Sequence, residues 1–195
     1  MQITQKKMSN RHLFTFNDES LNFAYSDKSG SGDVDIPYAH FPKKPFIKID
    51  QNEWLRNVGI LWLIIGVLQL GTALYADHYA GATLLWLTLG AICLAWAHYS
   101  KVKYTVFQAE KGSVFIIQDR STHDQIISEI RSRRKNQLLD WYGEIDTENA
   151  PENEIEKYKW LCEQEVLTKQ EAEQKISQVQ LAHTLAATNN PARLN

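Results

Sequence analysis

Cysteine is scarce in this sequence, and so are the patterns that mark common active sites. The two cysteines, Cys93 and Cys162, lie in segments of different character, and neither belongs to a Cys-x-x-Cys pair. A disulfide framework and a cysteine-based zinc site are therefore not expected. The six histidines are scattered, and the chain has no Walker loop, Gly-x-Ser-x-Gly elbow or His-Glu-x-x-His motif. We predict no catalytic residue, no metal and no cofactor.

Charge is also scarce, in two senses. The formal net charge of −2 is too small to indicate a nucleic-acid partner. Residues 57–100 contain no lysine or arginine, and Asp77 is their only acidic residue. Within this stretch, residues 58–76 and 79–97 form two apolar runs. As a helix rising about 1.5 Å per residue, each run covers roughly the 30 Å hydrocarbon core of a bilayer.

These two runs predict a transmembrane hairpin over residues 54–99. The alternative is a buried helical hairpin in a soluble protein, but two consecutive uncharged cores of this length are unusual in 195 residues. Lysine and arginine occur on both flanks of the hairpin, whereas the turn carries only Asp77 and His78. By the positive-inside rule, both termini are cytoplasmic and the turn faces outward. The expected location is the inner membrane of a bacterium, as a multi-pass protein. The first long apolar run begins near residue 58, so no amino-terminal signal peptide is expected.

Small and amide side chains in the two runs are candidates for contacts between helices. They are Gly66, Gln69, Gly71, Gly90, Ala91 and Ala95. Small residues let helix backbones approach, either within one hairpin or between copies, and we favour the first. Gln69 is expected to bond Thr83 or Thr88 across the helices. Neither run contains a charged side chain, which argues against an ion channel or transporter.

The sequence on both sides of the hairpin predicts a small antiparallel β domain. Apolar residues alternate with polar ones in short segments separated by Gly, Asn, Asp and Ser. The predicted strands are residues 12–16, 21–25, 34–38, 46–49, 102–107 and 113–117. A helix follows, with Thr122 and Gln125 forming a capping-box pattern at its start and Gly143 ending it.

A small antiparallel sheet closed by one helix resembles the pleckstrin-homology-like fold. The resemblance lies in residues 21–25, 32–38 and 104–142. It implies a membrane-tethered α+β protein in which a transmembrane hairpin is inserted into the β domain. No lipid-binding motif matches the phosphoinositide sites of eukaryotic relatives. We expect the first β half to span residues 1–53, the hairpin 54–99, and the second β half with the closing helix 100–143. A linker over residues 144–153, a helical pair over 154–182 and a flexible tail over 183–195 are expected to follow.

The closing helix carries a basic cluster. Arg131, Arg134 and Lys135 share one face by three- and four-residue spacing. One interpretation is contact with anionic lipid headgroups, worth about 1 kcal/mol per cation near the surface. The other, which we favour, is a solvated face paired with Glu129 or Asp140.

The last part of the chain resembles the SHOCT module, a short pair of carboxy-terminal helices. Residues 156–161 and 166–171 carry the resemblance, and Thr168 with Glu171 predicts a capping box. Glu165 stands where that family usually has glycine, and Ala172 where it usually has an aromatic residue. The resemblance implies a role in protein interaction or assembly. So short a pair should dock on the sheet domain or on another copy.

Three functions follow as hypotheses. The first is a non-enzymatic inner-membrane protein with a cytoplasmic interaction domain, as a homo-oligomeric scaffold or an envelope component. The second is an accessory or immunity-type membrane protein that binds a toxin or an enzyme. The third is an enzyme acting at the lipid surface, which requires scattered residues such as His12, His40 and His123 to converge.

Overall fold

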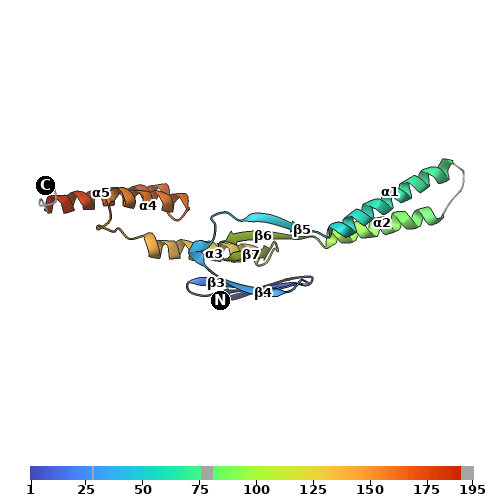
Figure 1. The fold of residues 1–195 in the computed structure, drawn as a ribbon, viewed down its shortest axis with the longest axis horizontal. Coiled ribbons are helices and arrows are strands. Elements are labelled where there is room, and N and C mark those ends of the chain that lie inside the picture. The colour runs from blue at the N-terminus through green and yellow to red at the C-terminus, as the bar shows by residue number, and fades with distance from the viewer. Residues whose placement is uncertain (28, 76–80, 190–195) are drawn as a thin grey trace.

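The computed structural model describes residues 1–27, 29–75 and 81–189. Over these residues the chain is an α+β fold with two antiparallel sheets and five α-helices. Figure 1 shows an elongated arrangement. The α1–α2 hairpin projects from one end of the two sheets, and the α4–α5 pair lies beyond the other end.

The first sheet has four strands in the order β1-β2-β3-β4. These strands are β1 (Gln2–Lys7), β2 (Asn10–Phe16), β3 (Ser20–Ser26) and β4 (Ser31–Pro37). Three of them match predicted strands, and β1 does not. Its sequence, QITQKK, has one large apolar residue, so it lacks the apolar alternation that identified the others. A short 3-10 turn, η1 (Tyr38–His40), follows β4.

The second sheet has three strands in the order β5-β6-β7, and the apolar hairpin interrupts it. These strands are β5 (Phe46–Asp50), β6 (Val102–Ala109) and β7 (Gly112–Ile117). Helices α1 (Glu53–Tyr75) and α2 (Gly81–Tyr99) lie between β5 and β6 in the sequence. Asp50 at the end of β5 pairs with Val102 at the start of β6. The hairpin therefore leaves the sheet and returns to it at adjacent positions.

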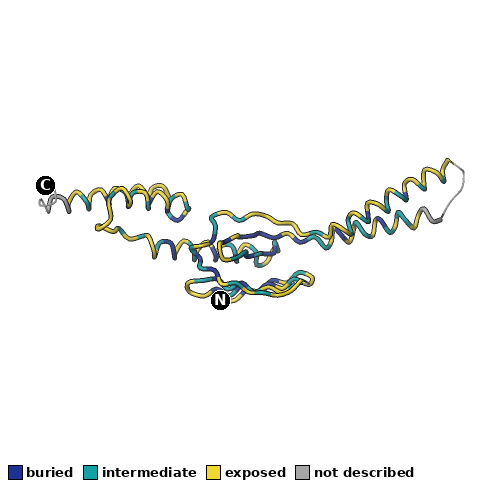
Figure 2. The backbone as a smooth tube through the Cα atoms, viewed as in Figure 1, coloured by how far each residue is buried: buried dark blue, intermediate teal, exposed yellow. Residues whose placement is uncertain are grey.

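The main core lies between the two sheets and α3 (His123–Tyr142). The large buried side chains include Phe14 and Phe23 of the first sheet, Ile116 of the second, and Ile126 and Ile130 of α3. Figure 2 shows the buried backbone concentrated in these sheets and in the start of α3. Burial of such side chains stabilises the domain by about 1.5–3 kcal/mol each. The two β halves on either side of the hairpin thus share one core.

The hairpin leaves many of its apolar side chains uncovered. Helix α1 is long and apolar enough to cross a membrane, and the described apolar part of α2, Leu84–Tyr99, is shorter. Leu68 and Leu74 of α1 are 66% and 75% exposed, and Ile92 of α2 is 62% exposed. The predicted turn residues Asp77 and His78 lie outside the described residues.

The predicted carboxy-terminal pair is present as α4 (Pro151–Glu163) and α5 (Lys169–Asn189). Helix α4 begins inside the segment assigned to a linker, with Pro151 at a first-turn position that favours proline. Helix α5 continues through residues 183–189, for which the sequence indicated a flexible tail. The alanine and leucine residues of this segment are strong helix formers. Residues 190–195 lie outside the described part of the chain.

Candidate functional site at the basic helix and the helical pair

Helix α3 carries the predicted basic cluster. The residue that caps the start of this helix is not the predicted one. The Thr122 side chain makes no capping hydrogen bond, so the predicted Thr122–Gln125 capping box is wrong. Instead, Asp119 Oδ1 accepts hydrogen bonds from the backbone N–H groups of Thr122 at 2.7 Å and His123 at 3.1 Å. Burial works to raise the pKa of Asp119, but these hydrogen bonds outweigh it and hold that pKa below its usual value. A carboxylate three residues earlier therefore caps the helix.

Arg133, the neighbour of Arg134 on α3, has a structural role. Its Nε donates to Glu129 Oε1 at 2.6 Å, and its Nη1 donates to the carbonyl oxygen of Asn17 at 2.7 Å. Its guanidinium also lies over the rings of Phe16 and Tyr38. Arg133 thus ties α3 to the first sheet, and the hydrogen bond with Glu129 raises its pKa.

Arg134 connects the sheet domain to the helical pair. Its Nε donates to the carbonyl oxygen of Phe41 at 2.8 Å, just after η1. Its Nη1 and Nη2 donate to Gln164 O at 3.1 Å and Oε1 at 2.6 Å, in the turn between α4 and α5. All three acceptors are neutral. Burial lowers the pKa of Arg134, and the nearby charge of Glu165 only partly opposes this.

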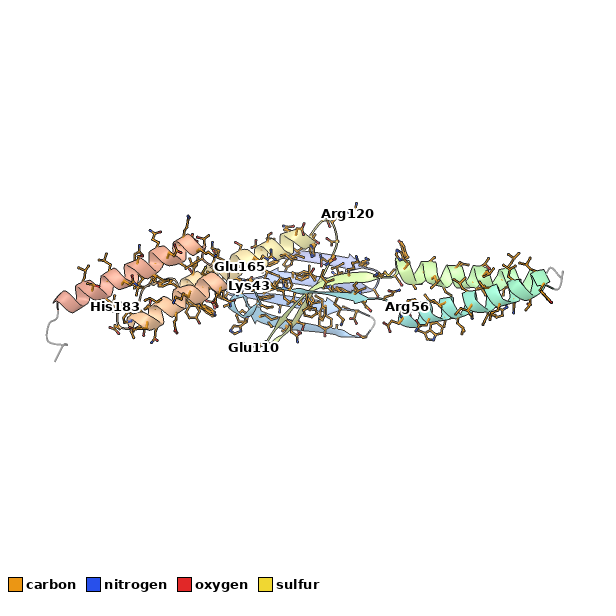
Figure 3. All side chains as sticks on the ribbon, turned by 90° about the horizontal axis from the view of Figure 1, so that it is seen from above. Lys43, Arg56, Glu110, Arg120, Glu165 and His183 are labelled. Atoms are coloured by element: carbon orange, nitrogen blue, oxygen red, sulfur yellow. The ribbon has the colours of Figure 1, made fainter. Side chains whose placement is uncertain are left out.

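The three predicted residues Arg131, Arg134 and Lys135 line one small cavity of about 80 Å³. Lys43 and Glu165, which the sequence did not place near this cluster, also line the cavity, and their side chains form an ion pair of 3.1 Å. Figure 3 shows Lys43 and Glu165 side by side where the sheets meet the helical pair, whereas Arg56 lies at the base of the hairpin. Lipid contact by this cluster remains a prediction. We refer to this cavity as the basic pocket.

The helical pair docks on the carboxy-terminal end of α3. Tyr158 and Lys175 both donate hydrogen bonds to the carbonyl oxygen of Gly143, at 3.2 and 3.3 Å. Leu138 of α3 packs in a buried cluster with Leu161 and Val179 of the pair. This arrangement satisfies a carbonyl at the end of α3 and buries the apolar faces of two short helices.

The turn between α4 and α5 explains one departure from the SHOCT pattern. Glu165 N donates to Cys162 O at 3.0 Å, and Val166 N donates to Leu161 O at 3.0 Å. These two bonds form a Schellman motif, which places residue 165 in the left-handed conformation that favours glycine. Glu165 has φ of 58°, so a glutamate adopts this conformation here. The predicted capping box of α5 is confirmed, because Glu171 Oε2 accepts from Thr168 N at 2.7 Å and Thr168 Oγ1 accepts from Glu171 N at 3.2 Å.

An exposed aromatic surface lies where the end of α3 meets α4 of the helical pair. The Tyr142 ring packs edge-to-face against Trp141 and against Trp160, with centroids 6.3 and 5.5 Å apart. Trp141 is 53% exposed, and Tyr142 and Trp160 are each 40% exposed. We call these three residues the aromatic corner. Residues 140–163 around it contain eight acidic residues and two lysines. Exposed aromatic clusters of this kind are typical of protein interaction surfaces.

The small residues of the hairpin divide into two groups. A side chain at Gly66 would meet Leu87 at 2.7 Å, and one at Gly90 would meet Leu63 at 2.8 Å, so both glycines lie between the helices. Gly59, not predicted, has the same role against Leu94 and Cys93. The other predicted small residues face outward and are exposed: Gly71, Ala91 and Ala95. Both kinds of contact that the sequence suggested, within and between hairpins, are thus sterically available.

Gln69 is half-buried in α1. The Thr88 hydroxyl donates to the carbonyl oxygens of Leu84 and Leu85 in its own helix, both at 2.9 Å. Thr83, the other expected partner, has a side chain outside the described part. Gln69 also offers its backbone carbonyl to the Thr72 hydroxyl at 2.9 Å.

Several titratable side chains of the sheets make structural contacts. A polar cavity of about 750 Å³ at the hairpin end is lined by Asp27, Asp50 and Tyr104 among others. Asp27 there caps a turn by accepting from Ser29, which lowers the pKa of Asp27. His12 is buried against Tyr104, and His123 bonds Thr105 Oγ1 at 2.8 Å on another part of the sheet. Among the described residues, no three His, Cys, Asp or Glu side chains are grouped to hold a metal ion.

Comparisons with known proteins leave the family open. No family model matches the chain, and no curated protein or solved structure matches it either. The resemblances to the pleckstrin-homology-like fold and to the SHOCT module therefore remain predictions.

Proposed function

We propose that this protein is a non-enzymatic, membrane-anchored scaffold whose hairpin spans the inner membrane of a bacterium. The observation that carries the proposal is the uncovered apolar surface of the hairpin. In water, side chains such as Leu68 and Ile92 would form a large exposed apolar patch, which soluble proteins rarely tolerate. In a bilayer the same surface is satisfied, and helices bond their own backbone groups. Helix α1 spans the membrane, and α2 returns through it.

The connection to the sheet supports one orientation. Because β5 and β6 pair directly up to Asp50 and Val102, both ends of the hairpin lie on the same side of the membrane. Arg56 near the start of α1 and Lys101 after α2 place positive charge on that side. By the positive-inside rule, the sheets and both termini are then cytoplasmic. In this proposal the pleckstrin-homology-like domain is held at the membrane surface.

The helical pair is the interaction element in this proposal. It lies at the end of the molecule opposite to the hairpin, where a cytoplasmic partner has free access (Figure 1). The aromatic corner supplies the apolar anchor, and the acidic residues around it favour a partner, or a second copy, that presents basic groups. The role implied by the SHOCT resemblance agrees with this position.

A cross-linking experiment tests the interaction role. A photo-activated cross-linking residue is placed at Trp160, and at Lys111 in the exposed β6–β7 turn as the matched control. We expect a discrete adduct in native membranes from position 160 only. Two differently tagged copies of the chain then show whether the adduct is a homo-oligomer. Equal adducts at both positions, or none at either, would contradict the proposed surface.

Deletion of residues 151–195 tests the division of roles. We expect the shortened chain to remain in the membrane fraction. It should not form the cross-linked complex that we expect of the full chain. The sheet domain should stay folded because its core is separate from that of the pair. An unchanged complex size would contradict assembly through the helical pair.

A further inference from the structure

Arg134 is a half-buried cation whose charge is not neutralised by direct contact. Its hydrogen-bond partners are the carbonyl oxygens of Phe41 and Gln164 and the amide oxygen of Gln164. No carboxylate of the described residues lies within ion-pair distance of it. Removing a guanidinium from water without a counter-ion is costly, so the basic pocket favours an anion.

The groups around Arg134 add positive charge. Lys43, Arg131 and Lys135 line the same pocket, and Glu165 is its only carboxylate among the described lining residues. The hydrogen bond from Lys43 lowers the pKa of Glu165, and the charges of Lys44 and Arg131 act in the same direction. Glu171 at the start of α5 does not line the pocket, and its carboxylate accepts the capping bonds of Thr168. The pocket therefore retains a positive charge after Glu165 is counted.

Glu165 is a weakly held anion in this position. Its side chain is 69% exposed, and its backbone has the left-handed conformation that costs non-glycine residues energy. Exposed ion pairs such as Lys43–Glu165 contribute little to stability. A stronger anion can therefore replace the carboxylate without disturbing a core.

We propose that the basic pocket is a binding site for a phosphate group, which displaces the Glu165 carboxylate. The phosphate accepts hydrogen bonds from Lys43, Arg131 and Lys135, and Arg134 supplies a fixed positive charge. Arginine and lysine are the side chains that recognise phosphate oxygens. The cavity of about 80 Å³ has room for a single phosphate group, with the rest of the ligand outside it. The site does not depend on the hairpin lying in a membrane.

The same chemistry occurs in soluble phosphate compounds and in lipid headgroups. The pocket lies beside the helical pair, and Figure 3 shows it separated from Arg56 at the hairpin base by the length of the sheets. This position favours a soluble source. Binding there would occupy the junction at which Arg134 and Lys43 hold the α4–α5 turn.

The test uses the full chain in non-ionic detergent, with inorganic phosphate and pyrophosphate as probes in calorimetric titrations. We expect saturable binding to the native chain. Glu165→Gln removes the competing charge and should tighten binding about fivefold, whereas Arg131→Gln with Lys135→Gln should weaken it at least about tenfold. The matched control, Lys111→Gln with Arg120→Gln, removes one lysine and one arginine from exposed turns and should leave the affinity unchanged.

Two further results decide the matter. Binding that is absent, or that changes equally in the pocket and control double variants, would overturn the proposal. Looser binding in Glu165→Gln would also overturn it, because a carboxylate with a purely structural role would not compete. Vesicles with and without anionic lipid identify the source of the phosphate. If anionic vesicles compete with pyrophosphate and neutral vesicles do not, the phosphate belongs to a lipid. If neither kind of vesicle competes, the phosphate belongs to a soluble compound.

Discussion

The side-chain amide of Gln5 hydrogen-bonds the backbone of Ile117 in the way that a neighbouring strand would. Gln5 Nε2 donates to Ile117 O at 2.9 Å, and Gln5 Oε1 accepts from Ile117 N at 2.8 Å. Gln5 is 1% exposed and lies on β1, while Ile117 ends β7. These two bonds join the edges of the two sheets, which belong to the two halves of the chain separated by the hairpin.

Replacing Gln5 by leucine should therefore destabilise the domain. The change leaves the buried N–H of Ile117 without a partner, at a cost of about 1–3 kcal/mol, whereas the C=O of Ile117 keeps a hydrogen bond from the backbone N–H of Asp119 at 2.8 Å. Chemical unfolding measures the loss, and hydrogen exchange should become faster at the Ile117 amide. Gln2→Leu makes the same change on the exposed side of β1 and should have little effect. Equal effects of the two substitutions would contradict the account of Gln5.

His12 should make the domain sensitive to mild acid. Burial lowers its pKa below 6.5, although a hydrogen bond to the Phe115 backbone and the charge of Asp27 oppose this. An unfolded His12 gains a proton more readily, so the free energy of unfolding falls as the pH drops below 6.5. The fall is up to about 1.4 kcal/mol per pH unit until the folded-state pKa is reached.

Unfolding measured between about pH 7.5 and about pH 5.5 tests the role of His12. His12→Phe retains the ring contacts with Phe23 and Tyr104 and should flatten the pH dependence. His40 is exposed, and His40→Gln should leave the dependence unchanged. If His12→Phe follows the native curve, His12 is not the titrating group.

The conformation of Glu165 predicts an unusual order of stabilities. Glu165→Gly and Glu165→Ala both remove the ion pair with Lys43, so they differ mainly in the left-handed backbone at this position. The glycine variant should have a folded-to-unfolded ratio on the order of tenfold higher than the alanine variant. Thermal unfolding of the helical pair in the full chain measures this. A more stable alanine variant would argue against the Schellman turn.

The packing of the hairpin is open to a direct chemical test. A Cβ at Gly59 would lie 3.1 Å from Cys93 Cβ, so a separation of the two helices by a few tenths of an ångström brings the pair to the roughly 3.5–4.5 Å found in disulfides. We expect Gly59→Cys to form a disulfide with Cys93 on mild oxidation, in a chain with Cys162→Ser. Gly66→Leu should then reduce the yield because its side chain would collide with Leu87, whereas Gly71→Leu points into open space and should not. Similar yields in both leucine variants would contradict the observed packing.

Much of the β domain could be predicted from sequence because its strands alternate. Large apolar residues at every second position of β2 and β3 form one buried face, and the predicted segments lie within the observed strands. The sequence also predicted that the hairpin is inserted into the β domain, because apolar and polar residues alternate on both sides of the hairpin. The sequence did not reveal that the strands divide into two sheets, because alternation does not specify strand partners.

The missed features depend on residues that are distant in sequence. Strand β1 could not be identified because the partner of its buried Gln5 is Ile117, 112 positions away. The contribution of Lys43 to the basic pocket depends on the docking of the α4–α5 turn, which no local pattern encodes. Asp119 replaced the expected Thr122 cap because both residues suit the start of a helix, and only the fold decides between them.

The central claim is that the hairpin spans a membrane and holds the sheets in the cytoplasm. Its most direct test is labelling with a membrane-impermeant maleimide, in chains where Cys93 and Cys162 are replaced by serine. We predict that His78→Cys in the hairpin turn is labelled in intact spheroplasts, whereas Lys111→Cys in the β6–β7 turn is labelled only after lysis. Labelling of Lys111→Cys in intact spheroplasts, or recovery of the native chain in the soluble fraction, would contradict the account.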